Sequence, residues 1–197
     1  MRSSKPSLIV IAIACLACFA GTPQLFGQNL VSNGSFETGD FTGWTTGGNF
    51  EFTRVTSGPF SQYSGAQDGM YYAYLGPVGS DGTLSQTFAT TNGAIYTLSF
   101  WFAAVGDEPS DFSVYWDGTP LLNLANPNTG SNWMQFSALV TATGNDTLLF
   151  SFRDDPAYMA LDNISVGACC STAPEPSSWI LLVTGALALG KLAWRRG

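Results

Sequence analysis

The sequence predicts an all-β fold in which two sheets pack into a sandwich. Between residues 29 and 168, short runs rich in aromatic and β-branched residues are broken by Gly, Asn, Asp or Pro about every eight to twelve residues. Several runs alternate apolar and polar side chains, and no long amphipathic helical pattern occurs between them. Two packed sheets bury one face of such strands most simply, so a two-sheet sandwich is expected.

The chain of 197 residues divides into one domain and two targeting ends. We expect a signal peptide with an N-terminal signal helix over 1–27, the β-sandwich over 29–168, a linker over 169–173 and a C-terminal signal over 174–197. With both ends set aside, the remaining length fits a single hydrophobic core.

The N-terminal segment has the parts of a secretory signal. Arg2 and Lys5 precede an uncharged apolar run over 8–20, and small residues follow it. Cleavage after Ala20 and cleavage after Gly27 both stay open.

The cysteines leave two questions open. Lipidation at Cys18 is an alternative to simple cleavage, although Cys15 stands where lipoprotein signals usually have an aliphatic residue. An exported protein can form disulfides, but the adjacent Cys169 and Cys170 are poorly placed to form a stabilising disulfide with each other. Intermolecular pairing and free thiols are both possible for them.

Three runs, at 95–102, 112–116 and 147–153, alternate with a period of two, and 159–166 is expected to be a closing strand. The inward side chains predicted from the first and third runs are Tyr96, Leu98, Phe100, Phe102, Leu148, Phe150 and Phe152. The opposite faces carry more polar residues.

The charge and composition of the chain argue against nucleic-acid binding and against catalysis or metal binding by histidine. Of 14 Asp and Glu residues, 13 lie in 29–168, where Arg54 and Arg153 are the only bases. Such a surface repels phosphate, so no nucleic-acid partner is expected. The chain has no histidine, which removes the usual general base and the commonest metal ligand.

The tail is predicted to be a transmembrane helix over 179–194. This stretch is apolar apart from Lys191 and has tryptophans at both ends, where amphipathic rings prefer the membrane interface. As a helix it would be about 24 Å long, shorter than the roughly 30 Å hydrocarbon core, and Lys191 can snorkel towards the headgroups. The terminal arginines would lie on the cytoplasmic side and the acidic domain outside. A core helix is the alternative, but the stretch has almost no polar face.

The tail resembles the PEP-CTERM sorting signal of Gram-negative bacteria, because a Pro-Glu-Pro motif, an apolar stretch and a basic end occur together in about the last two dozen residues. The resemblance implies an exosortase-type processing enzyme as partner, cleavage near the motif, and delivery to the cell surface or exopolysaccharide matrix. The family's basic end is often richer than the one found here. The matching residues are Pro174, Glu175, Pro176, Trp179, Arg195 and Arg196.

The domain resembles the galactose-binding-like jelly rolls, which include many carbohydrate-binding modules. The segments that carry the resemblance are "NLVSNGSFETGDFTGW" at 29–44, "YTLSFWF" at 96–102 and "ALDNISV" at 160–166. It implies a two-sheet jelly roll, and these structural motifs transfer a fold more directly than a function.

A structural calcium often joins the first and last strands of those modules, so the resemblance implies calcium as a cofactor here. Glu37 and Asp162 match its carboxylates, and backbone oxygens around Asn33 and Ser35 could complete an oxygen shell. Alternatively, Asn33 and Gly34 form a turn, Glu37 is solvated and Asp162 caps a neighbouring loop.

A sugar site needs an aromatic platform beside hydrogen-bonding groups, because pyranose rings have apolar faces ringed by hydroxyls. Alternation places Trp101, Tyr115 and Arg153 on the polar faces of three strands, so we expect one shared ligand-binding surface. Alternatively, the two aromatic residues pack under a covering loop, and Arg153 pairs with Asp154 or Asp155.

An enzyme would have to use carboxylates, and two acidic clusters offer them. Asp107, Glu108 and Asp111 form one cluster, and Asp154 with Asp155 forms the other. A glycosidase needs two carboxyl groups facing each other across a cleft at roughly 5 to 10 Å. Solvated turns explain both clusters more simply.

Together, these patterns predict an exported, non-enzymatic protein that binds polysaccharide or extracellular matrix. It would be made as a membrane-anchored precursor and held at, or released from, the cell surface, outer envelope or matrix. The alternatives are a structural matrix or adhesion protein without a discrete ligand site and, less favoured, a glycan-active hydrolase.

Overall fold

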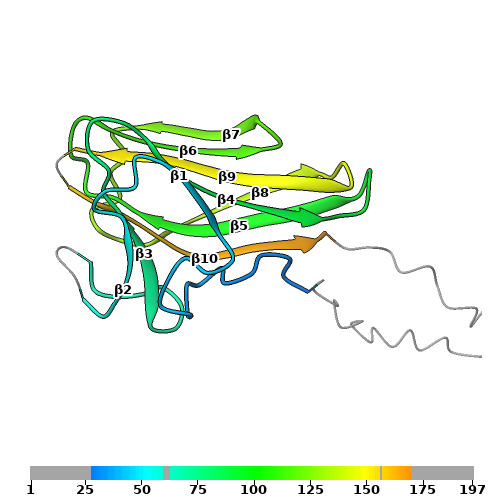
Figure 1. Cartoon of the computed structure of the whole chain (residues 1–197), viewed down its shortest axis with the longest axis horizontal. Helices are drawn as coiled ribbons and strands as arrows, with labels where there is room; N and C mark the ends of the chain where they lie inside the picture. The colour runs from blue at the N-terminus through cyan, green and yellow to red at the C-terminus, as the bar shows by residue number, and fades with distance from the viewer. Residues whose placement is uncertain (1–27, 60–62, 156, 170–197) are drawn as a thin grey trace, which may run out of the picture.

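The computed structural model describes residues 28–59, 63–155 and 157–169, and these form an all-β sandwich of two antiparallel five-stranded sheets (Figure 1). The predicted two-sheet jelly-roll sandwich is confirmed. The predicted signal helix over 1–27, most of the linker, the sorting motif and the transmembrane helix over 179–194 lie outside the described residues. Within the described part of the chain, no helix has the length and apolar character needed to cross a membrane.

We call the two layers sheet A and sheet B. Sheet A has the order β1 (Thr45–Gly48), β4 (Gly82–Ala89), β9 (Asn145–Asp154), β6 (Ser110–Trp116) and β7 (Thr119–Ala125). Sheet B has the order β2 (Arg54–Ser57), β3 (Tyr71–Leu75), β10 (Met159–Ala168), β5 (Ile95–Ala103) and β8 (Met134–Thr141). Strands that follow one another in sequence often lie in different sheets, so the sheet to which a strand belongs is a property of the whole topology.

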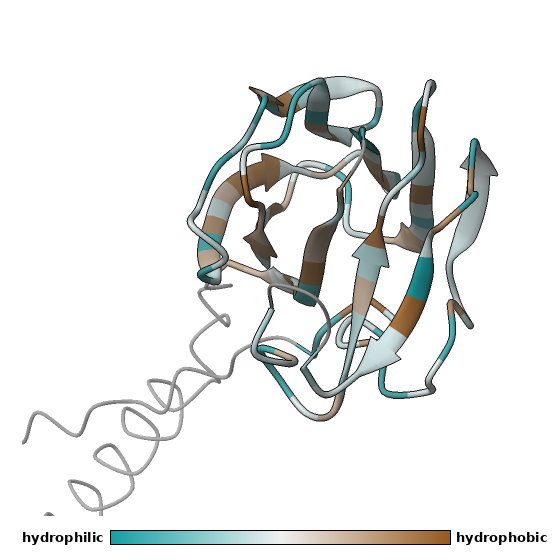
Figure 2. Cartoon of the chain, turned by 90° about the vertical axis from the view of Figure 1, so that its left-hand side faces the viewer, coloured by the Kyte–Doolittle hydropathy of each residue, from teal (hydrophilic) through white to brown (hydrophobic). Residues whose placement is uncertain are grey.

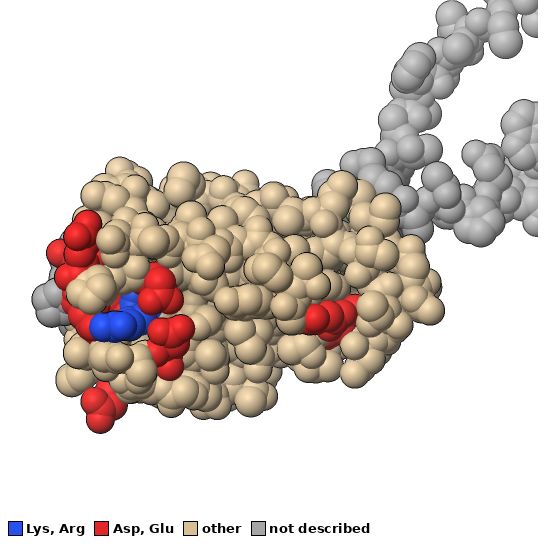
Figure 3. Space-filling view, turned by 90° about the horizontal axis from the view of Figure 1, so that it is seen from above, with Lys and Arg blue, Asp and Glu red and all other residues tan. Residues whose placement is uncertain are grey.

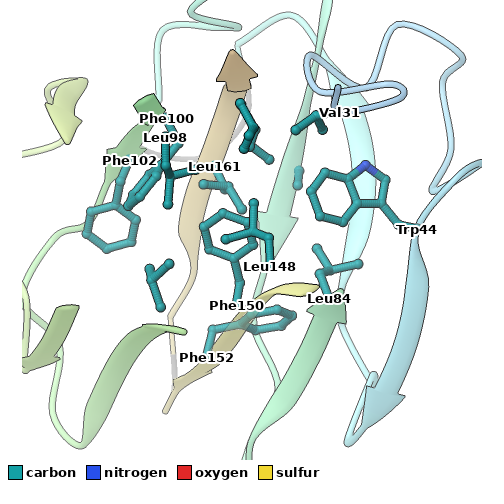
Figure 4. Close-up of a cluster of buried hydrophobic side chains, with 14 of the residues drawn as sticks. Val31, Trp44, Leu84, Leu98, Phe100, Phe102, Leu148, Phe150, Phe152 and Leu161 are labelled. Atoms are coloured by element: carbon teal, nitrogen blue, oxygen red, sulfur yellow. The ribbon is translucent and has the colours of Figure 1, made fainter. Parts of the chain in front are cut away.

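The core lies between the sheets, where the alternating strands turn their apolar side chains (Figure 4). Figure 2 shows hydrophobic and hydrophilic residues following one another along the strands. Phe102 of sheet B and Phe112 of sheet A pack with their ring centroids 4.2 Å apart, and Phe100 meets Phe150 edge-on at 5.3 Å. Such aromatic pairs stabilise the sandwich beyond the area they bury. All the inward residues predicted from alternation are buried: Tyr96, Leu98, Phe100, Phe102, Leu148, Phe150 and Phe152.

The segment before β1 closes the sandwich by binding the last strand. The amide of Leu30 donates to the Val166 carbonyl at 2.8 Å, and the amide of Ile164 donates to the Gly34 carbonyl at 3.0 Å. A Cβ at residue 34 would overlap the carbonyl oxygen of Ile164, so this close approach requires glycine. The described core runs from Val31 to Val166, which places it entirely within the 29–168 domain.

A smaller aromatic cluster covers part of the outer face of sheet B. Tyr63, from the loop between β2 and β3, is 2% exposed and donates to the backbone carbonyl of Tyr158 at 2.6 Å. Trp133 meets Tyr72 edge-on at 5.9 Å and donates its indole N–H to the Gly65 carbonyl. This outer surface is therefore partly occupied by the protein's own loop.

The sandwich has two distinct ends. Residues 28 and 169 both lie at one end, which we call the terminal pole (Figure 1). The turns over 49–53, 76–81 and 104–109, and the described residues between β9 and β10, gather at the other end, which we call the distal pole.

Candidate functional site

The outer face of sheet A carries a row of small polar side chains beside two larger apolar ones. Ser151 of β9 lies opposite Thr83 of β4 and Ser113 of β6. One pleat further towards the terminal pole, Leu149 lies opposite Tyr115. The side chains at these positions are the non-core halves of alternating strands, so the sequence pattern itself places them outward.

Charged groups gather on the same face at its distal end. Arg153 lies opposite Asp111 in the β6–β9 register and forms an ion pair with Asp155. Figure 3 shows the basic group surrounded by carboxylates on this face. Burial, and then the charge of Asp81, raise the pKa of Asp111, while the hydrogen bond from Arg153 lowers the pKa of Asp155. With three carboxylates around one guanidinium, this end of sheet A is net acidic.

The structure does not bring the three predicted ligand residues together. Tyr115 and Arg153 lie on adjacent strands of sheet A, β6 and β9. Trp101 belongs to β5 of sheet B and is opposite Asp162 of β10 in the register. Since Phe100 and Phe102 face the core, Trp101 faces out of the other side of the sandwich. The expectation of one surface shared by all three residues is therefore wrong, and their role in binding stays a prediction.

The polar row of sheet A was not predicted from sequence. The alternation that turns Phe112 and Val114 inward also turns Asp111, Ser113 and Tyr115 away from the core, although neighbouring groups leave Ser113 only 6% exposed. That signal was present in the run at 112–116, but the pairing of β6 with β9, which sets these residues beside Ser151 and Arg153, is a long-range contact.

Glu37 and Asp162 hold one loop through its backbone. Asp162 is fully buried, and its Oδ2 accepts the amides of Gln67 and Asp68 at 2.7 and 2.9 Å. Glu37 Oε1 accepts the amides of Met70 and Tyr71, both at 2.8 Å. We call this arrangement the carboxylate clamp. Asp162 thus caps a neighbouring loop, which is one of the two roles that the sequence allows.

The other residues predicted to bind calcium lie close to the clamp. Ser35 donates its hydroxyl to Asp68 Oδ2 at 2.9 Å, and the carbonyl of Asn33 accepts the indole N–H of Trp44 at 3.1 Å. Among the described residues, no three or more Cys, Asp or Glu side chains are grouped so that they could hold a metal ion. The contacts shown form a loop clamp, and calcium stays a prediction from sequence.

Asp154 differs from the solvated turn residue expected at its position. It ends the inward-facing series of β9 and is 2% exposed, and its Oδ1 has no hydrogen-bond partner among the residues that the structure describes. Burial, followed by the charges of Asp107 and Asp155, raises its pKa to about 7. This carboxyl group is therefore a buried, titratable feature of the distal pole.

The predicted sorting residues cannot be placed in this site. Pro174, Glu175, Pro176, Trp179, Arg195 and Arg196 all lie outside the described residues, as does Cys170. Cys169 is described at the end of β10, where its amide donates to the Ile95 carbonyl at 2.9 Å.

Comparison with known proteins supports the fold. No protein-family model and no curated protein sequence matches the chain. The solved structure of TmCBM61 in complex with β-1,4-galactotriose is similar with a TM-score of 0.59 and 18% identity, over 72% of this chain and 99% of that one. The K1 cleaved adhesin domain of Lys-gingipain from Porphyromonas gingivalis W83 is similar with a TM-score of 0.53 and 19% identity, over 69% of this chain and 96% of that one.

A third similar structure is the CBM22-1 xylan-binding domain of Xyn10C from Paenibacillus barcinonensis. Its TM-score is 0.50 at 19% identity, over 74% of this chain and 97% of that one. At this level of identity the likeness shows a shared architecture. The chain is thus built like carbohydrate-binding modules and like an adhesin domain.

Proposed function

We propose that this protein is a non-enzymatic polysaccharide-binding protein and that it binds glycan on the outer face of sheet A. The observation that carries the proposal is the register of β6 and β9. It sets Tyr115 beside Leu149 as an apolar platform, next to Ser151, whose hydroxyl donates to Asp81 Oδ2 at 3.0 Å. Ser113 lies opposite Ser151 in the register and is 6% exposed. A sugar ring requires this combination of an apolar surface and hydrogen-bonding groups.

The net negative charge on the outer face of sheet A indicates which class of glycan this face would bind. Arg153 already binds Asp155, and Asp81 and Asp111 lie near it. A polymer rich in uronic acid or sulfate would meet net negative charge, so the proposed ligand is a neutral polysaccharide. Asp155 is occupied by Arg153 and by the amide of Gly79, which supports a structural role rather than an acid–base role for it.

We place the protein outside the cytoplasm, with export and sorting directed by its two ends. The support comes from the sequence: a signal-peptide pattern over 1–27 and a tail that resembles PEP-CTERM over 174–197. The exosortase-type enzyme and the membrane are its proposed processing partners. Fractionation of the expressing cells, followed by intact-mass measurement, tests both ends, because a cytoplasmic protein of full-length mass would contradict the proposal.

Affinity electrophoresis of the 29–168 fragment through gels containing galactan, xylan or alginate tests the binding. We expect at least one neutral polysaccharide to retard the fragment, alginate to have no effect, and Tyr115→Ala to abolish the retardation. Leu139→Ala is the matched control, because it removes an exposed apolar side chain from β8 of the other sheet. No retardation by any neutral polysaccharide would instead favour a structural matrix protein.

A further inference from the structure

We propose that a pocket at the distal pole binds one terminal sugar ring of a neutral glycan, with Phe52 and Tyr158 as its aromatic walls. This inference rests on the proposed polysaccharide-binding function and adds a second subsite to it. The pocket is a hollow of about 150 Å³ that three turns form together. Its lining residues are Phe52, Gly76, Val78, Ala157 and Tyr158.

Asn49 fixes two of the three turns to each other. Its side-chain amide donates to the Val78 carbonyl at 2.8 Å, and its backbone amide donates to the Asp81 carbonyl at 2.8 Å. Its Oδ1 also accepts the amide of Glu51 at 3.1 Å, which shapes the turn that carries Phe52. The pocket is therefore held open by backbone contacts before any ligand arrives.

Tyr158 is held as a rigid platform. Its ring stacks on Tyr74 with centroids 4.1 Å apart and an angle of 19° between the planes, and the guanidinium of Arg54 lies 5.3 Å from the Tyr74 ring. The ring also lies so close to Gly76 that a Cβ there would overlap its Cδ1 and Cε1 atoms. A platform fixed in this way loses little conformational entropy when a ligand stacks on it.

Phe52 is the third residue of a turn that the Thr53 amide closes by donating to the Phe50 carbonyl at 3.4 Å. Its side chain is 56% exposed, and its backbone has a φ of 59°, a region that bulky residues rarely adopt. A strained backbone that presents an aromatic ring to water is typical of ligand-binding positions. Here it presents the ring at a pocket whose opposite wall is Tyr158.

Size and charge identify the occupant. Pockets for drug-sized ligands have volumes of roughly 300–1,000 Å³, so this one takes a single ring rather than a stretch of chain. It opens at the end of the sandwich, which suits the end of a glycan. Asp155 accepts the amide of Gly79, the residue that follows the lining residue Val78. With Asp81 and Glu51 on the same turns, an anionic sugar would be repelled.

Amide spectra of the ¹⁵N-labelled 29–168 fragment test the proposal. The probes are the methyl glycosides of galactose, glucose, mannose, xylose and rhamnose, with methyl glucuronide as the anionic counterpart. At least one neutral glycoside should shift the amides of Phe52, Gly76, Val78 and Tyr158 in a saturable way, and the glucuronide should not. The proposal is overturned if no neutral glycoside shifts them, or if the glucuronide shifts them equally.

Variants provide a second measurement. Phe52→Gly removes the ring while suiting the positive φ, so affinity for the glycoside should fall at least tenfold without a lower melting midpoint. Gly76→Ala should weaken binding similarly by displacing the Tyr158 ring, and Leu139→Ala, which removes a side chain 65% exposed, should change nothing. Unchanged binding in Phe52→Gly would refute the pocket. If shifts appear only at Ser113, Tyr115 and Ser151, the pocket fails but the sheet A proposal stands.

Discussion

Glu37 and Asp162, from the first and last segments of the domain, bind neighbouring amides of one loop. The clamp ties the loop between β2 and β3 to the closing strand, and Asp162 also accepts the amide of Asn163 at 2.7 Å. Replacing Asp162 with Asn would turn an amide donor towards one of these N–H groups. Leaving a buried N–H without an acceptor costs about 1–3 kcal/mol, so the free energy of unfolding should fall by that amount in urea titrations.

Glu37→Gln is the matched control for this variant. Glu37 uses only Oε1 for both of its amide bonds, and a glutamine side chain keeps an oxygen there. The control should therefore lose less stability than Asp162→Asn. An equal loss in both variants would mean that charge, rather than amide acceptance, stabilises the clamp.

Melting the fragment with and without EDTA tests whether the calcium ion predicted from sequence is bound. Glu37 Oε1 and Asp162 Oδ2 each accept two loop amides, so we expect the melting midpoint of the fragment to be the same with and without EDTA. A bound ion stabilises the folded state by mass action, so a midpoint lowered by EDTA and restored by calcium would establish the ion predicted from sequence.

Stability should fall as the pH rises from about 4 through 7. Burial raises the pKa of both Asp154 and Asp162 to about 7, from an ordinary value of 3.8. Asp107 and Asp155 add to the effect at Asp154, and Asp68 adds to it at Asp162. Because the folded state holds these protons more tightly, their contribution is present in full below pH 4 and lost above pH 7. Each pKa unit corresponds to about 1.4 kcal/mol.

Urea titrations at several pH values measure this dependence. Asp154→Asn removes one of the two groups, so the variant should lose less stability than the parent between pH 5 and pH 8. A parent protein whose stability rises over that range would contradict the assignment of a raised pKa to these carboxyl groups.

Asn33 holds its segment through three acceptors that share the two N–H groups of its side-chain amide. Its Nδ2 donates to Thr38 Oγ1 at 2.7 Å and to the carbonyls of Asp40 and Thr42, each at 3.0 Å. Asn33→Asp, which is also the product of deamidation before Gly34, would set a carboxylate oxygen against three acceptors. We expect a loss of about 1–3 kcal/mol by urea titration, and a loss below 0.5 kcal/mol, about that of an ordinary surface change, would contradict the role assigned to Nδ2.

Trp101→Ala should leave polysaccharide binding unchanged, while Tyr115→Ala should reduce it about tenfold, or about 1.4 kcal/mol. The two aromatic residues lie on different sheets and face opposite sides of the sandwich. Binding isotherms with the neutral polysaccharide that retards the fragment provide the comparison. The reverse result would move the site to sheet B.

The alternation of apolar and polar residues correctly predicted which side chains face the core, because it is a local property of each strand. Phe100 and Phe150 were assigned to the core from sequence, and both are fully buried. The same period, followed to the end of its run, also predicts the burial of Asp154, but its neighbour Asp155 and a proline suggested a solvated turn. The sequence signal for this burial was that the alternation of inward and outward side chains continues through the charged residue Asp154.

The sheet to which each strand belongs could not be predicted in this way. β5 and β6 follow one another in sequence, yet they lie in different layers, which separates Trp101 from Tyr115. Only the long-range pairing of β6 with β9, and of β5 with β10, decides this. The Phe52 pocket also depends on three distant turns, so sequence spacing carried no sign of it.

The position of β10 has a mechanical consequence for a chain held by its C-terminal end. β10 is the middle strand of sheet B, bonded to β3 on one side and β5 on the other, and it runs towards the terminal pole. Tension between an anchor beyond residue 169 and a glycan bound at the distal pole would act parallel to β10. It would therefore shear the hydrogen bonds that join β10 to β3 and β5. Shearing requires many hydrogen bonds to break together rather than one after another, so the domain would resist drag as a tether between a cell and its surroundings.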